Sequence, residues 1–225
     1  MPTVVLANPK GGSGKSTVAL VLGQVLATQF STTIIDADPN QPISKWAADG
    51  RVPDGLAVVP NQSERTILDD IDTAIDRSAF VIVDLEGVGS RRMSYAISRS
   101  DLVLVPMQLC RTDAEGAAMA IQEIALEAKA RRQKIPFALA FTKTRVIAEG
   151  KSSRRIADDV REQGDFDIID VALNERDAFK AMWDQGRSLA DLDQSIVNNV
   201  PAAIMNATAF TQAVVNRFKQ GKLAA

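Results

Sequence analysis

Short apolar runs alternate along the whole chain with longer stretches in which apolar positions recur every three or four residues. The short runs are rich in Val, Ile and Leu and are apolar throughout. Continuous apolarity of this kind is typical of strands in a parallel sheet that is covered on both faces. We therefore expect strands at Thr3–Ala7, Thr32–Ile35, Phe80–Val83, Leu102–Val105, Phe137–Phe141 and Ile168–Val171.

The stretches between these runs have the periodicity of amphipathic helices. Their alternation with the strands predicts an α/β fold, in which a parallel β-sheet is flanked by helices on both faces and ligands bind at the carboxyl ends of the strands. The expected helices are Lys15–Thr28, Gln41–Ala48, Glu64–Asp76, Ala114–Arg132, Ser152–Gln163, Glu175–Trp183 and Ala202–Lys219.

Composition narrows the possible chemistry. The 225 residues, 46% of them hydrophobic and 24% charged, fit a single domain spanning residues 1–225. The net charge of −2 means that any contact with nucleic acid must come from a local basic patch. The chain has no His and one Cys, Cys110, which excludes His-based catalysis and an intramolecular disulfide. Because no segment resembles a signal peptide or a membrane span, we expect a cytoplasmic protein.

A glycine-rich segment, NPKGGSGKST, follows the first expected strand and precedes the first helix. This is the context of a phosphate-binding loop, in which glycines let backbone N–H groups point at phosphate oxygens and the helix N-terminus adds its dipole. Lys15 is placed to reach the β- and γ-phosphates, and the Ser16 hydroxyl to bind Mg²⁺. The residues expected to bind the nucleotide here are Gly11, Gly12, Ser13, Gly14, Lys15, Ser16 and Thr17.

Acidic residues follow two further strands. Asp36 and Asp38 end the second strand, where two carboxylates at i and i+2 can face one site: one can bind Mg²⁺ through a water and the other can orient the attacking water. Asp84 ends the next apolar strand, as in a Walker B element that holds Mg²⁺. The segment Asp84–Gly87 also fits a D-x-x-G switch, in which the Gly87 N–H senses the γ-phosphate.

The loop KGGSGKST matches the deviant Walker A pattern KGGxGK[ST] at every defined position and resembles that of the ParA/MinD family of ATPases, especially the small, ParF-like ParA class. The resemblance covers nearly the whole chain. It implies a P-loop NTPase fold, ATP and Mg²⁺ as cofactors, and a homodimer that forms on ATP binding. It also implies catalytic roles for three residues. Lys10 would reach the partner subunit's nucleotide, Lys15 its own, and Asp38 would position the attacking water.

The same resemblance makes Asp36 an indirect Mg²⁺ contact. Glu86 ranks below Asp38 as the group that activates water, because many ATPases carry a Glu directly after the Walker B Asp and Leu85 occupies that place here. The segment SDLVLVPMQLCRTDAEGA is similar to the family's next strand and loop through Pro106, Asp113 and Gly116, and we assign it to the dimer interface.

The segment FTKTRV follows the fifth expected strand, where nucleotide-binding proteins of this fold read the base. Thr142-Lys143-Thr144 begins like the guanine-binding motif N/T-K-x-D, but Arg145 stands where the Asp must be. This favours ATP over GTP. Thr144 and Arg145 match a pair in small ParA proteins, and we expect them to flank the adenine.

Basic residues gather in three later segments of the chain. In ParA proteins comparable residues form a stripe across the ATP-bound dimer that binds the DNA backbone without sequence preference, an interaction that salt weakens. Solvated helix faces would explain such clusters equally well. The expected DNA-binding residues are Lys151, Arg154, Arg155, Arg176, Lys180, Arg187, Arg217 and Lys219.

Several functions share these motifs. The leading hypothesis is a nucleoid-associated ATPase with slow intrinsic turnover that partitions DNA or positions a cargo. A ParB-like or other adaptor protein would stimulate hydrolysis and so release the dimer from DNA. Alternatives are a ParA-like factor for conjugal DNA transfer, a MinD-like membrane-associated ATPase, and a small-molecule P-loop kinase or synthetase. The C-terminal pattern AFTQAVVNRFKQGKLAA fits a helix packed on the domain better than a lipid anchor. A nitrogenase iron-protein type is excluded because its cluster needs two cysteines per chain.

Overall fold

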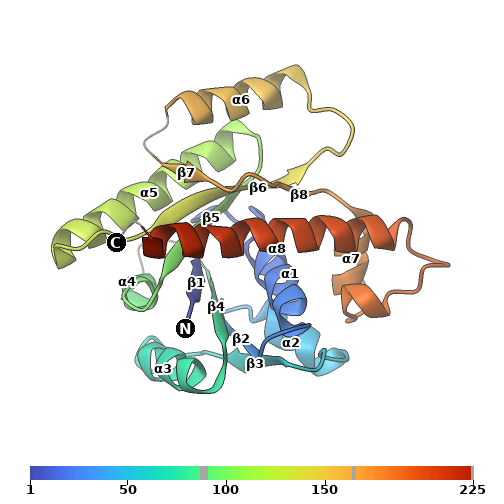
Figure 1. Cartoon of the computed structure of the whole chain (residues 1–225), viewed down its shortest axis with the longest axis horizontal. Helices are drawn as coiled ribbons and strands as arrows, with labels where there is room; N and C mark the ends of the chain where they lie inside the picture. Colours follow the sequence, from blue (N-terminus) through green and yellow to red (C-terminus); the bar gives the residue numbers. More distant parts are fainter. Residues whose placement is uncertain (87–90, 164–165, 224–225) are drawn as a thin grey trace.

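A computed structural model describes the backbone of residues 1–86, 91–163 and 166–223, and the side chains up to Phe218. Its centre is a parallel sheet (Figure 1). The strands of the described residues are β1 (Thr3–Leu6), β2 (Thr32–Ala37), β3 (Leu56–Pro60), β4 (Phe80–Leu85), β5 (Leu102–Met107), β6 (Phe137–Thr144), β7 (Asp167–Ile168) and β8 (Leu173–Asn174). They lie in the order β3-β2-β4-β1-β5-β6-β7, and β8 also pairs with β6. The predicted α/β class with a parallel sheet is confirmed.

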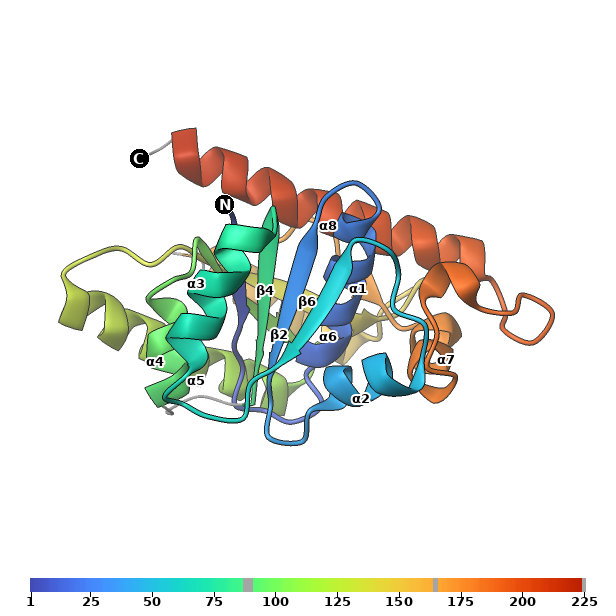
Figure 2. The same cartoon turned by 90° about the horizontal axis from the view of Figure 1, so that it is seen from below.

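Helices cover both faces of this sheet. One apolar core joins α1, α2, α7, η1 and α8 to one face, and a second joins α3, α4, α5 and α6 to the other face (Figure 2). Strand side chains alternate between the two cores: Leu6 and Ile34 point into the first, and Val5 and Ile35 into the second. The helices are α1 (Lys15–Ala27), α2 (Pro42–Asp49), α3 (Ile67–Arg77), α4 (Arg91–Ile97), α5 (Arg111–Arg131), α6 (Lys151–Glu162), α7 (Asp177–Asp184), the 3-10 turn η1 (Leu189–Asp191) and α8 (Val200–Leu223).

Several elements differ from the sequence prediction; the short elements β8 and η1 were not predicted, and three further differences concern β3, α4 and β7. Strand β3 was not predicted, although its residues LAVVP are all apolar; it lies at the edge of the sheet and is only partly buried. Helix α4 was not predicted because seven residues are too few to show a clear helical period. The strand expected at Ile168–Val171 is reduced to β7, which pairs with β6 through two residues before the chain leaves the sheet.

Helix α1 is apolar on nearly all sides because it lies between the sheet and α8 (Figure 1). A Cβ added at Gly23 would lie 2.5 Å from Ile34 Cδ1, so any larger residue would require the buried Ile34 side chain or α1 to shift. On α8, Phe210 and Val214 are buried in the same core, as expected of a helix that packs on the domain. Within the described part of the chain, no helix has the length and apolar character needed to span a membrane.

The topology brings the predicted site residues together at the carboxyl ends of the central strands. The first strand, β1, lies between β4 and β5, and the chain leaves it for α1, so a crevice opens at the carboxyl end of β1 where the winding reverses. On the neighbouring strands β2 and β4, Asp36 lies directly opposite Asp84. The parallel register therefore places two carboxylates side by side next to the glycine-rich loop.

Candidate nucleotide-binding site

A pocket of about 500 Å³ lies at the carboxyl ends of β1, β2 and β4. It collects residues that follow β1, β2 and β4, together with one residue of β6. Of the residues predicted to bind the nucleotide through the loop, all but Ser13 line it, and the Ser13 side chain is fully buried. The lining residues are Pro9, Gly11, Gly12, Gly14, Lys15, Ser16, Thr17, Asp38, Asn40, Glu86 and Lys143.

The shape of the loop depends on two of its glycines. Gly12 and Gly14 have φ angles of 81° and 98°, in the left-handed region that other residues rarely adopt. Gly14 is the N-cap of α1, and its carbonyl accepts a hydrogen bond of 2.8 Å from the Val18 N–H. The first N–H groups of α1 thus lie at the pocket without helical partners, as an anion-binding site requires.

Lys15, the first residue of α1, is 7% exposed and lies among acidic residues. Burial lowers the pKa of Lys15, and the charges of Asp84, Asp38 and Glu86 oppose this shift. Its ammonium is 3.5 Å from the Lys10 carbonyl oxygen. The structure therefore holds a lysine between the phosphate loop and the carboxylates, in the position expected of a group that neutralises bound phosphate.

Asp84 and Asp36 are both fully buried. Burial raises the pKa of Asp84 to about 7; the nearby Asp36 adds to the shift, and the Ser16 hydroxyl and Lys15 oppose it. Although Ser16 lies close enough to act in this way, neither Asp84 oxygen makes a hydrogen bond of good geometry. The pKa of Asp36 is also raised by burial; one of its oxygens accepts a 2.7 Å hydrogen bond from the Ser44 N–H, and the other has no partner.

A buried carboxylate oxygen lowers the stability of the fold unless a cation or a hydrogen-bond donor contacts it. Three oxygens without a hydrogen-bond partner lie at the end of two adjacent strands, next to the Ser16 hydroxyl. No group of three or more His, Cys, Asp or Glu residues that could hold a metal occurs among the described residues. The residues present fit Mg²⁺, which takes one or two carboxylates and fills its remaining positions with water and substrate phosphates.

Asp38 and Glu86, the two candidates for the group that orients water, both line the pocket. The Asp38 carboxylate accepts a hydrogen bond of 2.7 Å from the Asn40 N–H, which fixes the turn after β2. Glu86 is exposed. The geometry thus brings both carboxylates to the phosphate loop, and it does not separate their roles. Gly87, the predicted γ-phosphate sensor, lies outside the described residues.

Arg92 makes a contact that no sequence pattern predicts. Its Nη1 donates a 2.7 Å hydrogen bond to the carbonyl of Ala37, the last residue of β2, which stands between Asp36 and Asp38. Arg92 belongs to α4, so this side chain connects α4 to the acidic segment at the end of β2. Predicting this contact from the sequence would require knowing beforehand that α4 packs near the end of β2.

Lys10 is anchored through its backbone while its side chain stays outside the pocket lining. The Lys10 N–H donates to Asn8 Oδ1 at 2.8 Å, and the buried Asn8 amide donates to the Pro106 carbonyl at 2.7 Å. A Cβ at Gly116 would lie 2.9 Å from Asn8 Oδ1 and 3.0 Å from Lys10 Cβ, so glycine is needed there. Pro106 and Gly116, predicted to belong to the dimer interface, thus support the base of Lys10.

Comparison with known proteins agrees with this geometry. A family model described as the VirC1 protein matches residues 1–223. The chain belongs to the VirC1 family. A relative named ParA, from Rhizobium radiobacter, is 39% identical over 221 residues, which are 98% of this chain and 99% of that protein. The expected membership among ParA/MinD-type ATPases is confirmed.

Solved structures show the same fold at much lower identity. McdA from Cyanothece without nucleotide has a TM-score of 0.79 and 15% identity to this VirC1-family chain, covering 95% of it and 99% of McdA. A McdA–ATP complex has a TM-score of 0.75, again with 15% identity, and covers 96% of each chain. These likenesses establish the P-loop fold.

In this VirC1-family chain the expected adenine contacts lie beside the pocket and do not line it. Thr144 is buried, and its hydroxyl accepts a 2.8 Å hydrogen bond from the Asn174 amide. Arg145 is exposed, and its N–H donates to Glu149 at 2.5 Å. The residue of this segment that does line the pocket is Lys143, for which the sequence suggested no role.

The predicted DNA-binding residues lie on separate elements. Helix α6 lies above the β6–β7 side of the sheet, whereas α7 lies beside the beginning of α8 (Figure 1). Three of these residues form ion pairs: Lys180 with Glu175 at 2.9 Å, Arg155 with Asp159 at 3.9 Å, and Arg217 with Asp167. The Lys219 side chain lies outside the described residues. The exposed members are Lys151, Arg154, Arg155, Lys180 and Arg187, and Arg176 is half-buried.

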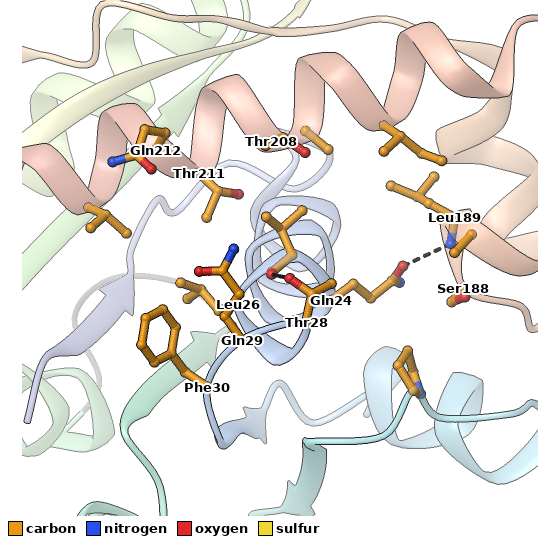
Figure 3. A pocket seen from close by; sticks show the side chains of 16 residues that line it. Gln24, Leu26, Thr28, Gln29, Phe30, Ser188, Leu189, Thr208, Thr211 and Gln212 are labelled. Carbon is orange, nitrogen blue, oxygen red and sulfur yellow. Dashed lines mark hydrogen bonds between the residues drawn. The ribbon is translucent and has the colours of Figure 1, made fainter.

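A second pocket, of about 250 Å³, lies between the end of α1, η1 and α8 (Figure 3). The side chain of Gln24 crosses its base, where Oε1 accepts a 2.9 Å hydrogen bond from the Leu189 N–H. None of the residues that line this pocket is charged. It therefore lacks the cations that nucleotide phosphates require, and the nucleotide site is assigned to the first pocket.

Proposed function

We propose that this chain is a Mg²⁺-dependent ATPase that works as a switch in partitioning DNA or positioning a cargo. The observation that carries the proposal is the first pocket, where the phosphate loop and Lys15 lie beside the buried carboxylates of Asp84 and Asp36, which have three oxygens without a hydrogen-bond partner. The relative named ParA and the McdA–ATP complex support ATP as the nucleotide.

Within this site, the loop N–H groups and Lys15 would bind the phosphates. Ser16 and Asp84 would hold Mg²⁺ directly, and Asp36 through a water. The ion supplies charge neutralisation on the phosphate oxygens. Asp38 would orient the attacking water and accept its proton, with Glu86 as the alternative. Because hydrolysis depends on one oriented water, intrinsic turnover is slow.

The switch would act through a homodimer that forms on ATP binding. Lys10, whose side chain does not line its own pocket, would reach the nucleotide of the second subunit. A cation supplied in trans can stabilise the charge that develops on the γ-phosphate. The ATP-bound dimer would bind DNA without sequence preference, and a ParB-like partner would release it by stimulating hydrolysis.

A contact between α7 and the phosphate loop supports coupling to DNA. The Trp183 indole N–H donates a 3.2 Å hydrogen bond to the Thr17 hydroxyl, and the Trp46 indole donates to the Met182 carbonyl at 3.0 Å. Helix α7 carries Lys180, and Arg176 is its N-cap. Movement of the loop or of α2 on nucleotide binding would therefore be transmitted to α7, which carries Lys180.

DNA binding measured by fluorescence anisotropy tests this proposal. Wild-type protein with ATP and Mg²⁺ should bind duplexes of unrelated sequence equally, and the affinity should fall steeply with salt. Protein with ADP should bind much more weakly. Equal binding in both nucleotide states, or binding that salt does not weaken, would contradict the DNA switch.

A second candidate function is a ParA-like factor that promotes conjugal DNA transfer. It is favoured by the segment ERDAFKAM, residues 175–182, which is similar to such proteins. The two functions share the ATP switch and differ in the partner. Purification of the tagged chain from its native cells should recover a small basic DNA-binding protein for partition, or a relaxase for transfer.

A further inference from the structure

Three side chains hold the carbonyl groups of the phosphate loop. Lys143 Nζ and Gln108 Nε2 each donate a 2.8 Å hydrogen bond to the Gly12 carbonyl. The Thr142 hydroxyl donates to the next carbonyl, that of Ser13, at 2.7 Å. Gln108 directly follows β5, and Thr142 and Lys143 lie near the end of β6. The carboxyl ends of these two strands therefore hold two consecutive peptide groups of the loop by hydrogen bonds.

These hydrogen bonds orient the N–H groups that would bind phosphate. The peptide unit is planar and trans, so its C=O and the following N–H point in opposite directions. Fixing the carbonyls of Gly12 and Ser13 therefore also fixes the N–H groups of Ser13 and Gly14. The loop is held in one arrangement before any nucleotide binds, which lowers the ordering cost of binding.

Lys143 has an unfavourable backbone conformation, and the hydrogen bonds of its two neighbours hold it there. Lys143 has φ 51°, in the left-handed region that glycine and asparagine adopt far more readily. Its neighbours Thr142 and Thr144 are buried, and both have hydrogen-bonded hydroxyls. These anchors turn the Lys143 side chain into the pocket. A lysine kept at a position better suited to glycine indicates that its side chain has a role.

The charge of Lys143 is available to a ligand. Among the described residues, no carboxylate lies within ion-pairing distance of its ammonium, and the nearby Glu175 pairs with Lys180. Lys143 is exposed and lines the pocket on the side of β6, opposite the carboxylates that follow β2 and β4. It is thus a third cation beside the loop, in addition to Lys10 and Lys15.

We propose that Lys143 is a third lysine of the nucleotide site, which sets the phosphate loop before binding and adds its charge to the binding of nucleotide phosphates. The inference rests on the proposed ATP binding. Because the N–H groups of Ser13 and Gly14 would serve any bound phosphate chain, Lys143 acts on ADP and ATP alike. Lys10, by contrast, would act only on ATP in the dimer.

Isothermal titration with ADP and with ATPγS in Mg²⁺ tests the proposal, using Lys143→Met and the control Lys134→Met. Lys134 is an exposed lysine just before β6, at the opposite end of that strand. Lys143→Met should weaken both nucleotides about tenfold, whereas Lys134→Met should match wild type. If Lys143→Met binds both nucleotides as tightly as wild type, the proposal is wrong. If wild type binds neither nucleotide, the proposed function itself fails.

Lys143→Asn separates a binding role from a purely structural one. Asparagine relieves the left-handed strain but lacks the charge and the reach to Gly12. The melting temperature of the nucleotide-free variant should therefore equal or exceed that of wild type, while its affinity for both nucleotides falls. A melting temperature that drops together with the affinity would show that Lys143 only stabilises the fold.

Discussion

Replacing the Asp84 carboxylate by the amide of asparagine should stabilise the nucleotide-free protein at alkaline pH. Burial raises the pKa of Asp84 from 3.8 to about 7. Between these values the folded protein retains a proton that the unfolded chain releases, so the free energy of unfolding falls as the pH rises. At about 1.4 kcal/mol per pH unit, the total loss for wild type is about 4 kcal/mol, complete just above pH 7.

The amide introduced by Asp84→Asn does not titrate, so the free energy of unfolding of the variant does not fall with pH at this position. An unpaired buried amide has its own cost of about 1–3 kcal/mol, but that cost does not depend on pH. The advantage of Asp84→Asn over wild type should therefore grow by about 3 kcal/mol between pH 5 and pH 8, the interval that contains the upper two pH units of the titration. Comparing the two proteins cancels the pH dependence of the groups that do not interact with Asp84; Asp36, Asp38 and Lys15 do interact with it.

The assay is urea unfolding at pH 5 and pH 8 in the presence of EDTA, with Asp76→Asn as a control. Asp76 is an exposed residue of α3, and its substitution should leave the difference between the two pH values unchanged. With Mg²⁺ and ATP at pH 8, the order should reverse, because wild type gains stability from the ligand and Asp84→Asn gains little. An advantage that is equal at both pH values would refute the account of Asp84 as a buried, unpaired carboxylate.

Three further substitutions test separate parts of the account. Lys10→Ala should abolish ATP-dependent dimerisation in light scattering, and a dimer of normal stability would exclude the role in trans. Asp38→Ala should lower steady-state ATP hydrolysis at least about 100-fold and leave ATP bound; normal turnover would move the role to Glu86. Gly23→Val should destabilise the fold by about 1–3 kcal/mol in urea, because its side chain would collide with Ile34, and an unchanged midpoint would show that α1 can shift.

Features confined to one short segment could be predicted from the sequence. The phosphate loop and the acidic residues of β2 and β4 are recognisable because each is contiguous and sits directly after or at the end of an apolar strand. The parallel register then places Asp36 beside Asp84 without further information. The strands in the middle of the sheet were predicted for the same reason, since burial on both faces makes them apolar throughout.

Features that depend on long-range packing could not be predicted. Lys143 meets Gly12 across 131 positions of the chain, and Arg92 meets Ala37 across 55. Lys143 stands in a segment that begins like N/T-K-x-D, but nothing in that segment indicates a contact with Gly12, and no local pattern marks Arg92. The position of Thr144 outside the pocket lining has a related cause: alternation along β6 turns this side chain into the interior and its neighbour Lys143 into the pocket.

The central claim, that the pocket beside the phosphate loop binds ATP, is tested most directly by isothermal titration of Mg²⁺–ATP into wild type and Lys15→Met. Lys15 is buried among the carboxylates of this pocket, and methionine keeps the length of the side chain without its charge. The account predicts saturable binding to wild type and loss of binding in Lys15→Met. Equal affinity of the two proteins, or no binding to wild type, would contradict it.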